Sequence, residues 1–396
     1  MWTNFRKIDS LLTGKVSIYL DFIRGIAAIL VLMEHLSPML FAYANEGSVI
    51  KMLYIFNLLG GASVRIFFIL SGLFISRSIL KAIDTSSWSW SSYLINRFCR
   101  LYVVLVPALL ITFILDWLGS IFWGTPYGNA KDNLATFIGN LFFLQEIYVE
   151  PFGTNHPLWS LSCEFWYYVL FPLLLLMVKR GTKKSTRIIY LGLSSLIFIM
   201  IGIKISFYFL IWLMGTLILF LPIISPLKNR LVLITSFLIF CSASLLRPLV
   251  LTGKILGDKG NIMLYVDIFI GLAFVLFTYA LLNFYSKDRN INIVQSNTLF
   301  ERISRLLANF SFSLYLIHQP ILNFVHGWAL AKGFSGLKPS FLSFTIEVIL
   351  VFIMLGIAWL FSMVTEANTQ KLRRLIVKFI KQKSVTRLQN KKEIST

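Results

Sequence analysis

The chain has 396 residues, of which 57% are hydrophobic and only 14% are charged, whereas a soluble domain usually has roughly 25% charged residues. This composition excludes an ordinary soluble protein and predicts an all-α polytopic membrane protein. The formal net charge of +20 would suggest nucleic-acid binding in a soluble chain. The positions of the basic residues instead suit the cytoplasmic segments of a membrane protein, so we expect no nucleic-acid partner.

In chain order, a polar N-terminal segment (1–17) precedes ten apolar runs that are each long enough for a helix of about 17–25 residues to span a bilayer. The division between the fifth and sixth runs, at 202–206, is weak, and the short run 134–147 suits an interfacial or re-entrant piece. We therefore predict one ten-helix membrane domain over 18–365, followed by a cytoplasmic tail over 366–396. The ten runs are 18–40, 55–76, 101–118, 158–178, 187–203, 205–222, 231–247, 262–285, 306–330 and 341–365.

Basic residues fix the expected orientation. If both termini are cytoplasmic, most of the 37 lysines and arginines fall in the inner segments, as the positive-inside rule requires. The tail is a basic amphipathic segment suited to an anionic inner leaflet. The net charge is thus mainly a signal of topology, and the lipid bilayer is the expected partner.

The first apolar run carries four polar side chains that could form a site: Asp21, Arg24, Glu34 and His35. Arg24 and His35 are eleven residues apart, about 1100° of helical rotation, which places them on one face about 16 Å apart. Titratable side chains inside a membrane are costly and rarely face lipid. We therefore predict that this helix lines a polar cavity, with Arg24 near the cytoplasmic mouth and His35 in the outer half.

Residues on other runs fall at matching depths. Glu164 and His318 are expected near the level of His35, whereas Arg97 and Arg100 flank a helix at the inner surface. Arg65 lies in mid-helix and could face a ligand or pair with an acidic neighbour. The three cysteines are scattered without the spacing of a metal site or a disulfide framework, so we expect no metal.

Four segments, in this order, resemble the successive signatures of the membrane-bound acyltransferase-3 family: LDFIRGIAAILVLMEHL, GASVRIFFILSGLFI, LWSLSCEFWYYVLFP and SFSLYLIHQPI. Members of this family are typically ten-helix enzymes that acylate cell-surface sugars and related acceptors. The resemblance implies a cytoplasmic acyl-CoA donor, commonly acetyl-CoA, and a location in the bacterial inner membrane. It covers about residues 18–330.

The resemblance also implies roles for single residues. Arg24 and His35 match the family's essential pair, and Glu164 matches the acid of its WSLxxE motif. Tyr315 and His318 match its SYSLYLxH motif. Two departures matter: RFCRLYVVLVP delays the proline of the R-x-x-R-I-x-P motif, and Glu164 is followed by phenylalanine where a second acid is common.

The expected chemistry is acyl transfer from a thioester to a hydroxyl, for which histidine is a suitable base near neutral pH. His35 could deprotonate the acceptor hydroxyl or carry the acyl group transiently, with Glu164 as its orienting carboxylate. The residues expected to bind CoA phosphates are Arg24, Arg65, Arg97 and Arg100. Those expected near the acceptor are Trp159, Ser162, Tyr167, Tyr315 and His318, although an interfacial aromatic belt or simple packing would also explain them.

The function predicted from the sequence is O-acetylation of a cell-envelope polysaccharide or its lipid-linked precursor, with acetyl-CoA as the donor and a carbohydrate as the acceptor. Two other classes stay open: a polysaccharide exporter or polymerase, and a non-catalytic partner of a glycan synthase. Neither has a reason to combine arginines suited to CoA with His35, and a non-catalytic partner would tolerate its substitution. The sequence predicts no particular oligomeric state.

Overall fold

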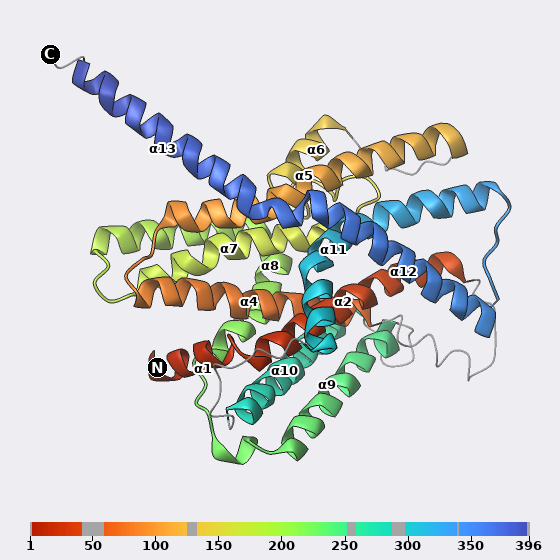
Figure 1. The fold of residues 1–396 in the computed structure, drawn as a ribbon, viewed down its shortest axis with the longest axis horizontal. Coiled ribbons are helices and arrows are strands. Elements are labelled where there is room, and N and C mark those ends of the chain that lie inside the picture. The colour runs from red at the N-terminus through yellow and green to blue at the C-terminus, as the bar shows by residue number, and fades with distance from the viewer. Residues whose placement is uncertain are drawn as a thin grey trace.

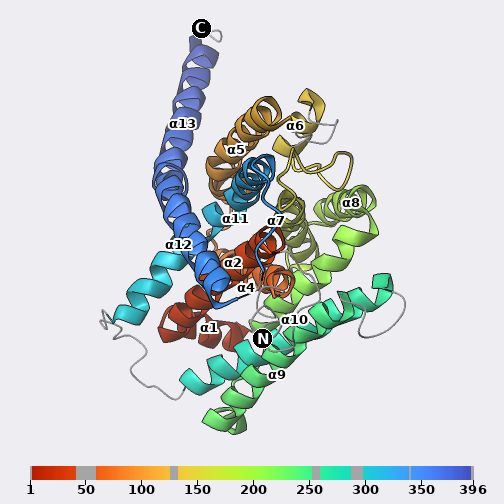
Figure 2. The ribbon, with the colours of Figure 1, turned by 90° about the vertical axis from the view of Figure 1, so that its right-hand side faces the viewer.

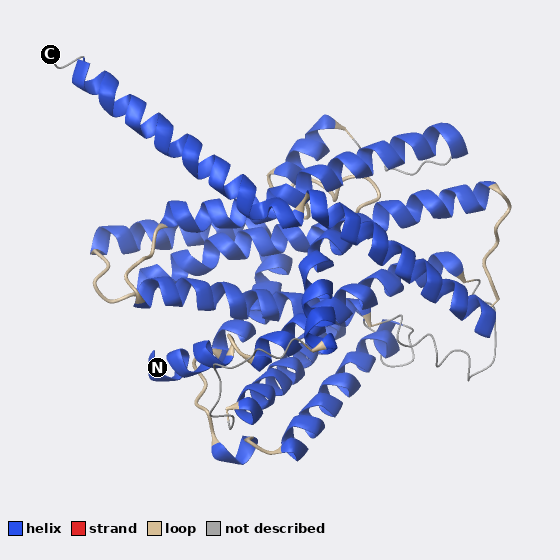
Figure 3. Cartoon of the chain, viewed as in Figure 1, coloured by secondary structure: helices blue, strands red, loops and turns tan. Residues whose placement is uncertain are grey.

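The computed structural model describes residues 2–41, 59–124, 133–251, 259–286, 298–338 and 340–393. All named elements within these ranges are helical (Figures 1 and 3). The α-helices are α1 (Trp2–Leu11), α2 (Lys15–Leu40), α4 (Gly60–Asp84), α5 (Trp90–Trp123), α6 (Leu134–Leu141), α7 (Leu158–Val178), α8 (Lys184–Ile218), α9 (Arg230–Leu251), α10 (Lys259–Tyr285), α11 (Leu299–Ala331), α12 (Phe341–Val364) and α13 (Thr369–Glu393). Short 3₁₀ turns, η2 (Ser225–Leu227) and η3 (Glu366–Asn368), precede α9 and α13.

Eight helices of the described ranges are long and apolar enough to cross a membrane, which confirms an all-α integral membrane protein. The predicted runs 187–203 and 205–222 form one helix, α8, with a break at Gly202. Gly202 has φ +70°, a left-handed conformation that favours glycine, so the weak division in the sequence is a kink. The run 306–330 lies inside α11, and residues 55–58 of the second run fall outside the described part.

Several helices extend past the predicted runs, and the differences at α5 and α6 matter for the site. α5 begins at Trp90, eleven residues before the apolar run at 101, because its first turns are polar and still helical. Arg97 and Arg100 therefore lie within this helix, and do not flank it. The short run at 134–147 contains an eight-residue helix, α6, whose N-terminus is capped by the side chain of Asn133.

The core of the bundle forms around α2, which packs between α4 and α11, while α4 packs on α8. Glycines allow α4 and α8 to approach closely. A Cβ on Gly215 would lie 2.0 Å from the carbonyl oxygen of Ile69, and one on Gly72 would lie 1.9 Å from that of Trp212. Contacts of this kind between small residues hold membrane helices together, because lipid offers no hydrophobic drive for their association.

One end of the bundle carries the N-terminus and the α4–α5 and α7–α8 connections (Figure 1). We call it the N-terminal end; it is the end predicted to face the cytoplasm. α12 ends at Val364, near the expected domain limit at 365, and the described chain continues as η3 and α13. α13 then runs away from the bundle (Figures 1 and 2).

Candidate functional site

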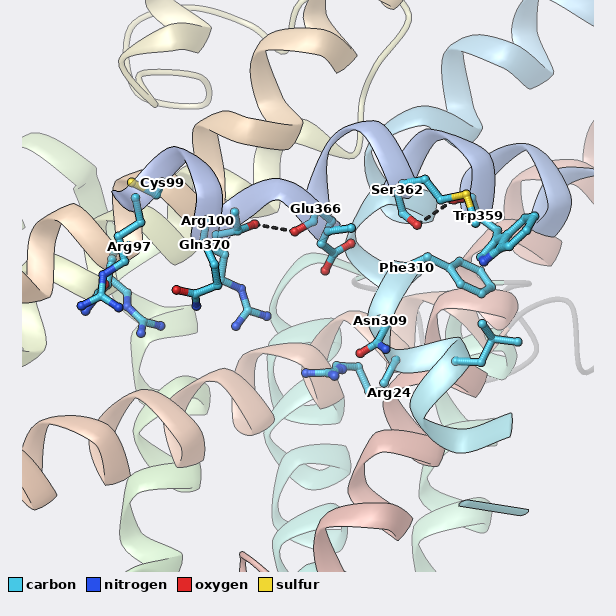
Figure 4. Close-up of a pocket in the computed structure, with 17 residues that line it drawn as sticks. Arg24, Arg97, Cys99, Arg100, Asn309, Phe310, Trp359, Ser362, Glu366 and Gln370 are labelled. Atoms are coloured by element: carbon cyan, nitrogen blue, oxygen red, sulfur yellow. Dashed lines mark hydrogen bonds between the residues drawn. The ribbon is translucent and has the colours of Figure 1, made fainter. Parts of the chain in front are cut away.

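Two adjoining cavities open inside the N-terminal half of the bundle. The larger, of about 720 Å³, lies among α2, α5, α11 and the segment from α12 to α13. Four arginines line it, Arg24, Arg97, Arg100 and Arg373, together with one carboxylate, Glu366. Figure 4 shows the side chains that surround this space. We call it the arginine cavity.

The second cavity, of about 210 Å³, lies deeper and is mostly apolar, with Phe67, Phe68 and Leu70 among its walls. We call it the inner cavity. Arg24 and Arg100 line both cavities and so mark the junction between them. Glu164 and Tyr315 are polar groups of the inner cavity. A ligand with an anionic head and a slender apolar arm would suit this pair of spaces.

The arginines of the larger cavity are only partly satisfied by the protein. Arg24 forms an ion pair with Asp21 at 3.1 Å, and Arg97 lies over the rings of Tyr93 and Tyr168 at 5.7 and 5.8 Å. The Nε atoms of Arg24 and Arg97 are buried without a hydrogen-bond partner among the described residues. Arg100 is exposed to the cavities that it lines. Buried donors are nearly always paired, so unpaired ones beside a cavity indicate a binding site for an anion.

His35, near the C-terminal end of α2, and His318, near the middle of α11, form a pair. Nδ1 of His35 is 2.8 Å from the carbonyl oxygen of Val31, and Nδ1 of His318 is 3.1 Å from that of Leu314. Because a carbonyl oxygen can only accept, each neutral ring carries its proton on Nδ1. Nε2 of His318 then faces the Nδ1–H of His35 at 3.3 Å, and Nε2 of His35 has a lone pair that accepts no hydrogen bond from the described residues.

Tyr315 separates the histidine pair from the inner cavity. Its ring lines that cavity and packs on His318 with centroids 5.9 Å apart, and its hydroxyl is 2.7 Å from that of Ser160. His35 lines neither cavity. The expected single cavity shared by Arg24 and His35 therefore reaches only as far as Tyr315, and His35 lies behind it.

Comparison with known proteins agrees with this architecture. The acyltransferase domain characteristic of membrane acyltransferases matches residues 17–363. The chain belongs to the acyltransferase-3 family. The match covers every helix that lines the two cavities except η3 and α13, so the family's membrane domain contains the histidine pair and most of the arginine cavity.

Several relatives of this acyltransferase-3 protein are known by function. It is 31% identical to the acyltransferase MdmB of Streptomyces mycarofaciens over 166 residues, 40% of this chain and 39% of the relative. It is 29% identical to an O-acetyl transferase of Shigella phage Sf6 over 168 residues, 41% and 46% of the two chains. It is 28% identical to the peptidoglycan O-acetyltransferase OatA of Listeria monocytogenes over 196 residues, 46% and 28%. The matched stretch thus spans less than half of each relative, and no solved structure matches the chain.

The family carboxylate, Glu164, has different neighbours from those expected. It accepts hydrogen bonds from Ser71 at 3.0 Å and from the hydroxyl of Tyr168, and it faces the inner cavity. The described hydrogen bonds of His35 go instead to Val31 and His318. The group that faces the Nδ1 atom of His35 is therefore an imidazole from α11, where a carboxylate from α7 was expected. A catalytic role for Glu164 stays a prediction.

Arg65 lies away from both cavities. It is 3% exposed and forms an ion pair with Asp267, which is fully buried, at 2.5 Å. It also donates to the carbonyl of Gly61 at 2.8 Å and to the hydroxyl of Tyr208 at 3.0 Å. Of the two readings of Arg65, these contacts favour pairing with an acid, which joins α4 to α10. Binding of CoA by Arg65 has no support in its contacts.

Three residues predicted near the acceptor instead contact other residues of the protein. The hydroxyls of Ser162 and Tyr167 are buried and donate to the carbonyls of Phe143 and Ile205, at 2.7 and 2.6 Å. Trp159 packs edge-on against Phe68 and does not line either cavity. A role in acceptor binding stays a prediction for all three, whereas Tyr315 and His318 do lie between the inner cavity and His35.

Two polar residues of the site, Glu366 and Arg373, were not anticipated from the sequence. Glu366 accepts hydrogen bonds from the backbone N–H and the hydroxyl of Ser313, at 3.2 and 3.0 Å, and so ties η3 to α11. The signal that could have found it is its position: it is the first acid after the last apolar run. Arg373 looked like one of many tail cations, and only the fold brings it to the cavity.

Proposed function

We propose that the protein is a membrane O-acetyltransferase that moves an acetyl group from cytoplasmic acetyl-CoA to a hydroxyl of a cell-envelope polysaccharide or its lipid-linked precursor. The observation that carries this proposal is the sequence of spaces along α11: an arginine cavity, an inner cavity that shares Arg24 and Arg100 with it, and the His318–His35 pair behind Tyr315. O-acetyl transferase and peptidoglycan O-acetyltransferase are names of relatives, and they support the acetyl group and a glycan acceptor.

The donor suits the cavities in charge, size and length. Guanidinium groups bind phosphate oxygens in a bidentate manner, and the arginine cavity offers four of them against one carboxylate. Its volume of about 720 Å³ falls within the range of roughly 300–1,000 Å³ usual for small-molecule sites. The inner cavity would take the pantetheine arm. Arg24 and His35 lie on one continuous helix about 16 Å apart, comparable to that extended arm.

In the proposed reaction, Nε2 of His35 accepts the proton of the acceptor hydroxyl as its oxygen attacks the thioester carbonyl carbon. The new C–O ester bond forms, the C–S bond breaks, and the proton passes from His35 to the departing thiolate to give free CoA. His318 positions His35, because its Nε2 accepts from the Nδ1–H and stabilises the imidazolium that forms. Acetyl-CoA and acceptor are both consumed as substrates.

The thioester must pass Tyr315 to reach His35 in this scheme. The ring closes the inner cavity, and a single hydrogen bond to Ser160 holds its hydroxyl. Rotation of this side chain would join the inner cavity to the histidine pair. A transient acyl group on His35 is the second route, and it needs the same Nε2 atom. Mass spectrometry of the intact protein after brief mixing with acetyl-CoA without acceptor, kept at neutral pH because acid hydrolyses an acyl-imidazole, would detect it.

The test is transfer of label from radiolabelled acetyl-CoA to extracted glycan by membranes that contain the protein. We expect label in glycan with the wild type and background levels with His35→Ala at equal protein abundance. A polysaccharide exporter or a non-catalytic partner would give equal labelling by both, and that result would reject the enzymatic function.

A further inference from the structure

We propose that the C-terminal segment, η3 and the first turns of α13, completes the donor site, with Arg373 binding the phosphate of CoA that lies farthest from the thioester. The proposal rests on the proposed function, since it names further residues for the same donor. The matched acyltransferase domain ends at residue 363, before this segment begins.

The segment forms a wall of the arginine cavity. Five of its residues line that cavity, which η3 and α13 close off on the side facing α5: Glu366, Ala367, Thr369, Gln370 and Arg373. Figure 4 shows Glu366 and Gln370 on the same side of the space as α13, opposite Arg24. Without this wall, the arginines of α2 and α5 would border an open groove.

Specific contacts fix the position of the wall. The Glu366 carboxylate accepts two hydrogen bonds from Ser313 of α11, and the Thr369 hydroxyl donates to the Glu366 carbonyl at 2.6 Å. α13 packs on α5, and Arg373 and Cys99 line the same cavity. Arg373 therefore stands beside the helix that carries Arg97 and Arg100.

The distribution of the four arginines between the cavities assigns each its phosphate. Arg24 and Arg100 also line the inner cavity, which would hold the pantetheine arm. They are therefore placed for the pyrophosphate, to which that arm is joined. Arg97 and Arg373 line the arginine cavity alone. The group of CoA farther from the arm is the ribose with its 3′-phosphate, so we assign this phosphate to Arg97 and Arg373.

The chain supplies a matched control. Arg374 is the next residue on α13, carries the same charge, and does not line the arginine cavity because it lies about 100° further round the helix. Its substitution changes the net charge of the tail as much as substitution of Arg373 does. A difference between the two variants therefore reports the cavity and not the overall charge.

The test is isothermal titration of the full-length protein in nanodiscs with CoA and with 3′-dephospho-CoA, for the wild type, Arg373→Ala and Arg374→Ala. We expect the wild type to prefer CoA. Arg373→Ala should weaken CoA binding about tenfold, equivalent to 1.4 kcal/mol, and leave 3′-dephospho-CoA binding unchanged. Arg374→Ala should match the wild type with both ligands.

Two results would overturn the assignment. One is unchanged CoA affinity in Arg373→Ala, and the other is an equal loss for both ligands, which would mean that Arg373 does not read the 3′-phosphate. Retained binding of 3′-dephospho-CoA also shows that the variant is folded. A wild type that binds neither ligand would instead reject the acyl-CoA donor of the proposed function.

Discussion

Replacing Arg24 with alanine should weaken CoA binding more than any other single arginine substitution in the site. Arg24 lies at the junction of the two cavities, its side chain is only 23% exposed, and its Nε has no hydrogen-bond partner among the described residues. It also neutralises Asp21, which lines the inner cavity. The substitution thus removes a cation and leaves a carboxylate where the phosphates are expected.

The magnitude follows from these contacts. A hydrogen bond to a charged group contributes about 1.5–3 kcal/mol, which corresponds to a loss of roughly ten- to a hundredfold in affinity. The uncovered Asp21 should place Arg24→Ala toward the upper part of that range. Arg24→Lys keeps the charge but not the bidentate geometry, so we expect an intermediate loss. Adding Asp21→Asn to Arg24→Ala should recover part of the affinity.

The assay is titration of purified protein in nanodiscs with CoA, compared with Arg6→Ala as a control. Arg6 forms an ion pair with Asp84 at 2.9 Å near the N-terminal end, is 68% exposed, and lies outside both cavities. Arg6→Ala should bind CoA as the wild type does. An Arg24→Ala protein that elutes from a size-exclusion column like the wild type, and whose Kd for CoA is within twofold of the wild-type value, would refute the placement of the phosphates at this junction.

Three further predictions concern the histidine pair, the helix packing and the buried ion pair. His318→Ala should lower kcat by at least tenfold with little change in the KM for acetyl-CoA, because it removes the acceptor facing the Nδ1–H of His35; an equal rise in KM would contradict a positioning role. Gly215→Ala should cost about 1–3 kcal/mol, measured as a lower thermal midpoint, because its Cβ meets the backbone of α4, whereas Gly192→Ala, with nothing within 4 Å, should be neutral. Arg65→Ala should lower the free energy of unfolding by about 1–3 kcal/mol, because it removes one hydrogen-bonded cation from the buried Asp267 and leaves Arg247 as its remaining ion-pair partner, while the folded fraction binds CoA normally; a selective loss of CoA affinity would restore Arg65 to the donor site.

Features that depend on local periodicity could be predicted from the sequence. The apolar runs gave the positions of the long helices, except that the fifth and sixth runs form the single helix α8. The eleven-residue spacing puts Arg24 and His35 on a common face, because α2 is continuous from Lys15 to Leu40. The weak division in the fifth and sixth runs was also informative, since the backbone breaks at Gly202. The depth argument brought His318 to the level of His35, where the two rings lie 5.1 Å apart.

Features that depend on contacts between distant segments could not be predicted. The pairing of Arg65 with Asp267 joins residues about 200 positions apart, and no periodicity within either helix identifies the partner. The start of α5 was misplaced because its first turns are polar, which hydropathy reads as a loop. The return of Glu366 and Arg373 to the cavity depends on the direction in which α12 ends, and composition alone made them part of a basic tail on the inner leaflet.

The central claim is that a nucleotide-bearing thioester lies along α11, with its phosphates between Arg24 and Arg100 and its acyl end against Tyr315, the side chain that separates it from His35. An electron cryomicroscopy structure of the His35→Ala protein in nanodiscs with acetyl-CoA tests this most directly. We expect the pyrophosphate at the junction of the two cavities and the acetyl group in the inner cavity beside Tyr315. Density for the nucleotide at any other surface, with the arginine cavity holding none, would contradict the account.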